Sequence, residues 1–176
     1  NNGEYSENEF YIDLDVSLNQ AGFPYMLTLT DNNGDDYNAA TIVQSSPLLI
    51  DLNQDGYYEI FFGDDGGYFH GVDYLGNPLS GFPIELPGTS SEIWGSPASG
   101  DIDNDGEIEF IVTSKNKHCY VIDEYGNIEL DYETDQYLMA TPSIGNLDND
   151  DDLEIIFFGY TTSGDVFVIN HDGSNL

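Results

Sequence analysis

The stretch SPASGDIDNDGEIEF, residues 96–110, decides the fold because it occurs three times along the chain in related form. The other two copies are SPLLIDLNQDGYYEI at 46–60 and TPSIGNLDNDDDLEI at 141–155. In each copy a proline lies four positions before an Asp or Asn that begins an acidic loop. An internal period of this length is typical of repeat proteins, in which each unit packs against its neighbours.

Each acidic loop is followed by an apolar segment rich in β-branched and aromatic residues, which predicts a β-strand. These segments are EIFFG at 59–63, EFIVT at 109–113 and EIIFFG at 154–159. A second apolar segment follows in each unit and leads into a glycine turn, at Gly76, Gly126 and Gly173. With GFPIEL at 81–86 as a short outer strand, a unit has about four strands, which is typical of one β-propeller blade. No helical periodicity is present, so we predict an all-β fold.

The repeats divide the chain into four parts of one propeller domain. We assign residues 1–45 to a partial blade and connecting loop, because AGFP at 21–24 repeats the outer-strand sequence SGFP at 80–83. Residues 46–95, 96–140 and 141–176 are blade repeats 1, 2 and 3, and repeat 3 lacks its last strand. A propeller needs about four to eight blades to close. We therefore expect a partial propeller, completed by the rest of a longer polypeptide or by another copy of the chain.

Oxygen-bearing side chains occupy positions 1, 3, 5 and 9 of each acidic loop, and the backbone carbonyl at position 7 is a further possible ligand. Carboxylates this close repel one another unless a cation lies between them. Alternating oxygens in a tight turn suit Ca²⁺, whereas Mg²⁺ needs a stricter octahedron and Zn²⁺ prefers nitrogen and sulfur. We predict about three calcium ions, bound by Asp51, Asn53, Asp55, Tyr57 and Glu59, by Asp101, Asp103, Asp105, Glu107 and Glu109, and by Asn146, Asp148, Asp150, Asp152 and Glu154.

Two details qualify these loops. Gly56 and Gly106 at position 6 permit a sharp bend, whereas the third loop has Asp151 there, a residue that tolerates a left-handed conformation at some energetic cost. An EF-hand requires a bidentate Glu at position 12, and these loops have Phe or Val there, so they are not EF-hands. The alternative, that Asn, Asp and Gly merely form hairpin turns, stays open for any single loop.

Composition restricts the partners. Against 34 acidic residues the chain has 2 basic ones, giving a formal charge of −32 that repels nucleic acid and anionic membranes. No apolar run approaches the 18 residues or so of a membrane span. Cys119 is the single cysteine, so no intrachain disulfide can form, and we expect it to be a buried apolar residue. Weak calcium sites fill at the millimolar calcium found outside cells, so we expect an extracellular or cell-surface location.

The pattern D-x-[DN]-x-D-G-x-x-E-[IF], preceded by SP and followed by V-[IV]-D-x-x-G-N and GFP, resembles the FG-GAP or VCBS family of propeller repeats. This family is found in integrin α-subunit heads and in many secreted bacterial proteins. The resemblance covers residues 46–176 well and 10–30 weakly. It implies a structural calcium ion in the turn between the first two strands of a blade, and a role in adhesion or binding. The chain departs from the family at Asp151 and by having Glu rather than Asp at position 9.

Two classes of function are compatible with this sequence. The first is a binding module for a glycan or a surface protein, without catalytic activity. The second is the propeller scaffold of a secreted polysaccharide lyase or glycoside hydrolase. We favour the first, because no paired acid and base stands out and His70, His118 and His171 share no motif. Trp94 and the tyrosines suit blade cores or sugar stacking, and Lys115 and Lys117 form the one basic spot.

Overall fold

The structure is a computed structural model, and it describes residues 29–30, 36–37, 42–148, 150–162 and 164–176. The partial blade expected over residues 1–45 therefore lies almost entirely outside the described residues. Within that part only β1 (Leu29–Thr30) and β2 (Asp36–Tyr37) are described as elements, and they pair antiparallel.

The rest of the described chain forms three antiparallel sheets, which we call blades. Blade 1 consists of β3 (Leu48–Ile50), β4 (Glu59–Gly63), β5 (Tyr68–Val72) and β6 (Ile84–Glu85). Blade 2 consists of β7 (Ala98–Gly100), β8 (Glu109–Thr113), β9 (His118–Ile122) and β10 (Ile128–Glu133). Blade 3 consists of β11 (Ser143–Gly145), β12 (Glu154–Phe158) and β13 (Val166–Ile169). In each blade the strands pair in chain order.

The strands form in the segments that the sequence predicted, and the three glycine turns have the expected backbone conformation. Gly76, Gly126 and Gly173 have φ of 80°, 90° and 83°, in the left-handed region that glycine adopts without strain. The outer strand of blade 1 is shorter than the predicted 81–86, because only Ile84 and Glu85 pair with β5. Pro83 directly precedes this pair and has no N–H to donate, which limits the ladder. None of the described segments is a helix long and apolar enough to cross a membrane.

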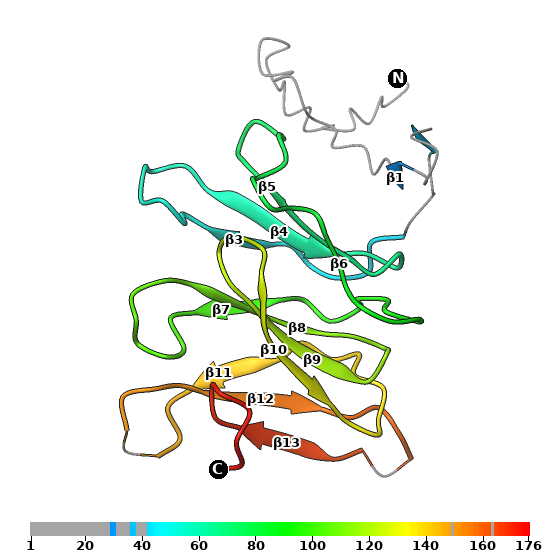
Figure 1. Cartoon of the computed structure of the whole chain (residues 1–176), viewed down its shortest axis with the longest axis vertical. Helices are drawn as coiled ribbons and strands as arrows, with labels where there is room; N and C mark the ends of the chain where they lie inside the picture. The colour runs from blue at the N-terminus through cyan, green and yellow to red at the C-terminus, as the bar shows by residue number, and fades with distance from the viewer. Residues whose placement is uncertain (1–28, 31–35, 38–41, 149, 163) are drawn as a thin grey trace, which may run out of the picture.

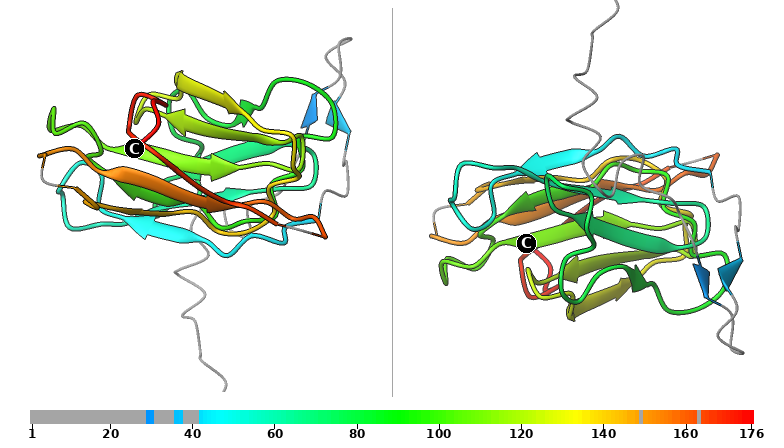
Figure 2. Two further views of the ribbon diagram at one scale, coloured as in Figure 1. Left: turned by 90° about the horizontal axis from the view of Figure 1, so that it is seen from below. Right: turned by 90° about the horizontal axis from the view of Figure 1, so that it is seen from above.

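The blades stack face to face, with blade 2 between the other two (Figure 1). One apolar cluster joins blades 1 and 2 and has Phe61, Phe69 and Phe110 at its centre, all fully buried. A second cluster joins blades 2 and 3 through Ile111 and Phe157. Seen along the stack, the strands of successive blades are rotated relative to one another (Figure 2). Burial therefore lies between blades, which is why a single blade has no core of its own.

Candidate metal centre

The three acidic loops occupy equivalent places, between the first and second strands of their blades. They project from the same side of the stack, on the left in Figure 1. Gly56 and Gly106 make the bends of loops 1 and 2, with φ of 90° and 94°, and an added Cβ would meet no atom within 4 Å at either glycine. Glycine is therefore required at these positions by the backbone conformation and not by packing.

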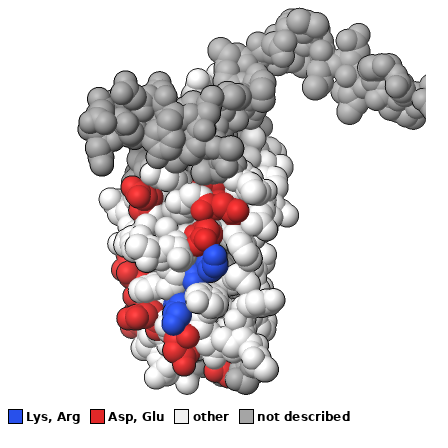
Figure 3. All heavy atoms as spheres, turned by 90° about the vertical axis from the view of Figure 1, so that its right-hand side faces the viewer, with Lys and Arg blue, Asp and Glu red and all other residues white. Residues whose placement is uncertain are grey.

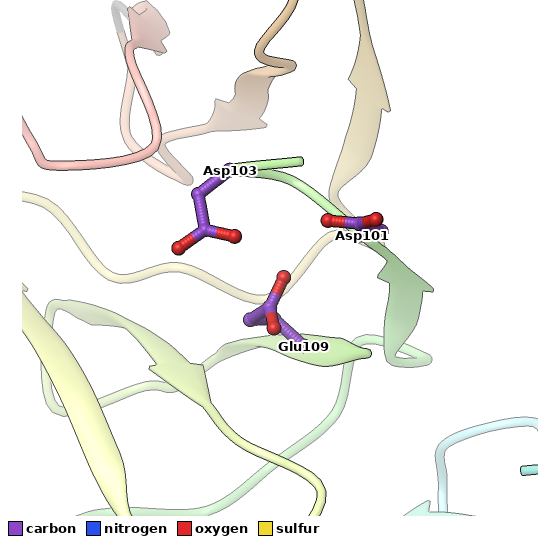
Figure 4. A group of neighbouring side chains, drawn as sticks. All are labelled: Asp101, Asp103 and Glu109. Carbon is purple, nitrogen blue, oxygen red and sulfur yellow. The ribbon is translucent and has the colours of Figure 1, made fainter. Parts of the chain in front are cut away.

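Loop 2, residues 101–109, brings carboxylates from both of its ends together. One oxygen of Asp101, one of Asp103 and one of Glu109 lie within 4.8 Å of one another. Figure 4 shows the three carboxylates directed toward a common space. The second indication is Asp101 Oδ1, which is buried and has no hydrogen-bond partner among the described residues. A buried acceptor without a partner, beside two other carboxylates, fits a bound hard cation.

Backbone hydrogen bonds hold the loop 2 carboxylates in place. The Gly106 N–H donates to Asp101 Oδ2 at 3.0 Å, and the Ile102 N–H donates to Glu109 Oε2 at 2.9 Å. The Asp105 N–H donates to Asp103 Oδ1 at 3.2 Å. Each of these bonds occupies one carboxylate oxygen, so the loop is shaped before any ion binds. Such preorganisation lowers the conformational cost of binding.

The electrostatics of loop 2 are unfavourable without a cation. Glu109 is 3% exposed, and its pKa is raised to about 7 by burial, with the charges of Asp103 and Glu129 adding to the effect and the Ile102 N–H opposing it. The pKa of Glu129, on β10, is also raised, by burial and then by Asp123 and the loop carboxylates. A divalent ion in the common space reverses both effects, because an opposite charge favours the ionised carboxylate.

Loop 3, residues 146–154, forms a second group of converging carboxylates. One oxygen each of Asp148, Asp150 and Glu154 lie within 4.8 Å of one another. The Leu147 N–H donates to Glu154 Oε2, as the matching residue does in loop 2. Desolvation and the neighbouring acids raise the pKa of Asp150, against the lowering effect of the Asp152 N–H. Loop 3 thus has the oxygen atoms that a cation site needs. Its first residue differs from that of loop 2: it is Asn146, whose Nδ2 donates to the Asp150 carbonyl.

Loop 3 turns differently from loops 1 and 2 at position 6. Among the described residues with positive φ are Gln54 and Asn104, at the fourth position of loops 1 and 2, but not Asp151. A side chain at position 6 disfavours the glycine bend of the other loops, and loop 3 turns without it.

Loop 1, residues 51–59, has Asn53 where loop 2 has Asp103, so it lacks the third acid of the loop 2 group. Asp51 accepts from two backbone groups, the Asp55 N–H and the Gly56 N–H, each at 3.0 Å. The Tyr57 ring stacks on Tyr74 at 4.2 Å between centroids. Because Asn53 replaces the second acid, this loop has one charge fewer to neutralise. Its oxygens are already satisfied in part by the backbone, as in a simple Asx turn.

Three residues beside loop 2 were not predicted as site residues. A cavity of about 300 Å³ lies against the loop and is lined by Asp103 and Glu109, by Glu129 of β10, and by His171 and Asp172 of blade 3. His171 Nδ1 lies 3.3 Å from Asp152 Oδ2 of loop 3. The sequence gives no signal for Glu129, because it is an alternating polar residue of an outer strand, and only the folded blade places it near the loop.

The remaining polar residues noted in the sequence lie elsewhere. His70 is 2% exposed and pairs with Asp64 in blade 1, with 2.9 Å between Nε2 and Oδ2. Trp94 is half-buried, and Lys115 Nζ lies 5.2 Å from its ring centroid. Lys115 is also paired with Glu92 at 2.7 Å. The two lysines of the chain, Lys115 and Lys117, lie among acidic side chains on the side of the stack opposite the loops (Figure 3).

A family comparison gives the repeat its name. The model of the FG-GAP-like repeat matches residues 51–112, from the start of loop 1 into β8. This segment is similar to an FG-GAP-like repeat. The match covers the acidic loops of blades 1 and 2 together with the apolar strand after each, which are the segments that predicted the repeat. Among curated protein sequences, none matches the chain.

Solved structures give the fold. BamB from Moraxella catarrhalis, a β-propeller protein, superposes with a TM-score of 0.52 and 20% identity, over 80% of this chain and 38% of BamB. BBS1N, in a complex with ARL6DN, has a TM-score of 0.46 and 12% identity, over 77% of this chain and 43% of BBS1N. The chain therefore spans less than half the length of either protein. The likeness to BamB shows the fold alone: the three stacked sheets are blades of a partial β-propeller, as predicted.

Proposed function

We propose that this chain is a calcium-binding propeller module in which the ion is a structural brace of the acidic loops. The observation that carries the proposal is loop 2, where Asp101, Asp103 and Glu109 converge and Asp101 Oδ1 is buried without a partner. The donors are hard oxygens on a flexible turn, which suits calcium better than magnesium or zinc. Loop 3 supports the same ion through Asp148, Asp150 and Glu154. Loop 1 is the weakest of the three sites.

We further propose a secreted or cell-surface protein whose role is binding or adhesion. A loop held together by carboxylates and backbone carbonyls has the affinity range that millimolar extracellular calcium saturates. The charge of −32 excludes anionic polymers as general partners. Exposed tyrosines, among them Tyr137 at 47% and Tyr160 at 67% exposure, offer aromatic faces for a glycan or a protein ligand. A catalytic role has less support, because His70, His118 and His171 lie in three different blades and each is near an acidic residue.

Calcium binding is tested by thermal unfolding and titration calorimetry of the full chain. We expect the melting temperature to be higher in millimolar Ca²⁺ than in chelator, and Mg²⁺ at the same concentration to give a smaller rise. At ten times Kd, one site adds about 1.4 kcal/mol to the free energy of unfolding. For a chain of this size that corresponds to a few degrees, at about 2–4 °C per kcal/mol.

A pair of variants localises the effect. Asp103→Ala together with Asp105→Ala should remove one binding event from the calorimetric titration and about one site's worth of the calcium-dependent rise in melting temperature. Asp135→Ala is the control, because Asp135 is an exposed acid outside the loops. Identical melting curves in calcium and in chelator would show that the loops are empty turns. Turnover of an acidic polysaccharide by the calcium-loaded chain would overturn the binding role in favour of catalysis.

A further inference from the structure

A backbone hydrogen bond joins the acidic loops of blades 2 and 3, which are neighbours on one side of the stack (Figure 1). The Leu153 N–H donates to the Ile102 carbonyl at 2.8 Å. Ile102 is the second residue of loop 2, and Leu153 is the eighth residue of loop 3. Ile102 is 2% exposed in the apolar cluster between the two blades, and Leu153 packs against that cluster. Leaving either backbone group unpaired there is costly, so the two peptides move together.

Each end of this bond leads to a proposed calcium ligand. The Ile102 N–H donates to Glu109 Oε2 at 2.9 Å, so the position of the Glu109 carboxylate in loop 2 is tied to the Ile102 peptide. Leu153 lies between Asp152 and Glu154, which are the proposed carbonyl and carboxylate ligands of loop 3. An ion that holds Glu109 therefore also fixes the peptide that positions the ligands of loop 3.

His171 makes a second connection between the same two loops. Its Nδ1 lies 3.3 Å from Asp152 Oδ2 of loop 3. The same side chain lines the cavity of about 300 Å³ beside loop 2, together with Asp103 and Glu109. The imidazole therefore lies between the two loops, in contact with loop 3 and facing the carboxylates of loop 2.

Neither connection is present between loops 1 and 2. The bond equivalent to that of Leu153 would run from the Ile108 N–H to the Leu52 carbonyl, and these two described residues form no such bond. The residue equivalent to His171 is Glu124, because each lies two positions before the glycine of its turn. An acid at this place adds to the repulsion between acidic loops instead of bridging them. Loop 1 thus lacks the contacts that link loop 2 to loop 3.

The charges of the loops do not oppose the binding of two ions at neighbouring sites. In loop 2 the three converging carboxylates of Asp101, Asp103 and Glu109 carry more negative charge than one Ca²⁺ neutralises. The occupied loop therefore has no net positive charge to repel a second ion. Under these conditions the ordering of the shared peptides decides the sign of the interaction, and it favours binding at both sites.

We propose that loops 2 and 3 bind calcium cooperatively, as a coupled pair, and that loop 1 is outside this pair. The proposal rests on the proposed function, calcium binding by the loops. The first ion orders the linked Ile102 and Leu153 peptides, and the second ion meets a link that is already ordered. Coupling between two sites is typically about 5–150-fold in affinity, and it is reciprocal. Emptying loop 2 therefore lowers the affinity of loop 3 by the same factor, without removing its binding event.

An NMR titration of the full chain with Ca²⁺ tests the coupling. The probe of loop 2 is the Gly106 amide, whose N–H donates to Asp101 Oδ2. Loop 3 is emptied by Asp148→Asn together with Asp150→Asn, because asparagine keeps the oxygen that accepts from the backbone at each position and removes the charge. We expect the Gly106 signal of this variant to titrate at a calcium concentration about fivefold or more above that of the wild type.

A matched variant controls for the loss of general charge. Glu133→Gln together with Asp135→Asn also removes two negative charges, at exposed positions of blade 2 outside the loops. We expect this control to shift the Gly106 titration much less than the loop 3 variant does. If the loop 3 double variant does not fold, Asp148→Asn alone allows the same comparison, with a smaller loss of the same sign.

Hydrogen exchange of the Leu153 N–H gives a second readout. In the loop 3 variant, we expect calcium to slow this exchange, although the loop that contains Leu153 has lost two of its ligands. The reference amide is that of Leu79, which donates to the Gly71 carbonyl in blade 1. A general gain in stability would slow the exchange of both amides equally, whereas the coupling slows that of Leu153 more.

The outcomes separate the coupling from calcium binding itself. If Gly106 titrates at the same calcium concentration in the wild type and in the loop 3 variant, the sites are independent, and calcium binding stands without coupling. An equal loss of affinity in the charge control would also overturn the coupling, because general attraction would then explain the effect. If calcium does not move the Gly106 signal of the wild type at all, both the proposed function and the coupling are wrong.

Discussion

Glu109 shows how one buried carboxylate links protons to stability. Its side chain closes loop 2 by accepting from the Ile102 N–H, and it is 3% exposed. Burial raises its pKa to about 7, from about 4.5 in an unfolded chain. Between these two values the folded state binds more protons than the unfolded state does. The stability from this group is thus fully present below pH 4.5 and lost as pH rises through about 7.

A pH series on the Glu109→Gln variant tests this linkage. In chelator, we expect the free energy of unfolding of the wild type to fall relative to that of the variant as pH rises from about 4.5 to 7. The difference in slope is at most about 1.4 kcal/mol per pH unit, the limit for one proton. Glutamine keeps the acceptor for Ile102 and removes the charge. Urea unfolding followed by Trp94 fluorescence measures both proteins.

The same comparison of wild type and Glu109→Gln, repeated in Ca²⁺, is the control. In millimolar Ca²⁺ the ionised carboxylate is the favoured form, so the wild type should become the more stable protein above pH 7. Parallel stability curves for wild type and Glu109→Gln in chelator would show that the carboxylate is not strained in the folded state. The other acids of the loop cancel in this comparison, because both proteins contain them.

At the scale of the element, the strands were the most predictable part and the outer strands the least. The predicted strands at 59–63 and 109–113 coincide with β4 and β8, because their alternate residues fill the clusters on both faces of a blade. The predicted outer strand at 81–86 was reduced to Ile84–Glu85, because an outer strand has one partner only and a proline interrupts its donors. A central strand is buried on both faces, so its sequence is apolar and predicts the strand well. An outer strand is less buried, so its sequence predicts it poorly.

The loops were predictable as ligand patterns but not as geometry. All three have oxygens at positions 1, 3, 5 and 9, and in loops 2 and 3 three of the carboxylates lie within 4.8 Å of one another, whereas loop 1 has an amide, Asn53, in place of one acid. In loop 1 the backbone satisfies both oxygens of Asp51. Glu129 was missed because its approach to loop 2 depends on how β10 lies against β9, which no spacing in the sequence encodes.

The junction between blades 1 and 2 depends on a glycine that no loop or turn requires. Gly63 lies in β4 under Ile93, and a Cβ there would come within 2.1 Å of Ile93 Cγ2. We expect Gly63→Ala to lower the free energy of unfolding by about 1–3 kcal/mol, the usual cost of overpacking a filled core. Chemical unfolding in millimolar Ca²⁺ measures it.

Two further variants separate packing from backbone effects at this junction. Gly145→Ala is the control, because an added Cβ at Gly145 of β11 meets nothing within 4 Å. Ile93→Ala removes the clashing methyl groups but also loses buried contact, so the double variant Gly63→Ala, Ile93→Ala should lose less stability than the sum of the two single variants. If the two glycine variants were equally destabilised, the cost would come from strand backbone rather than from the contact with Ile93.

The whole molecule is dominated by unbalanced charge. With 34 acidic and 2 basic residues, the repulsion between acids opposes the compact state wherever no cation intervenes. The two lysines lie on the side opposite the loops (Figure 3), so neither lysine offsets the charge of the loops. Folding of the metal-free chain must therefore rely on the apolar clusters between blades against a general repulsion. In the proposed sites calcium neutralises particular loop carboxylates, whereas salt screens the repulsion between all the charges of the chain.

This difference gives the last prediction. In chelator, the melting temperature should rise steadily as NaCl increases from about 0.1 to 1 M, because the screening length falls from about 10 to 3 Å. In millimolar Ca²⁺ the rise should be smaller, since the ions already neutralise the closest carboxylates and salt has less repulsion to screen. The Asp103→Ala and Asp105→Ala double variant should lie between the two in chelator, because two of the loop charges are gone. Differential scanning calorimetry of the three samples decides. An equal rise in all of them would mean that salt acts on the apolar junctions, and that the loop carboxylates are too well hydrated to weaken the fold.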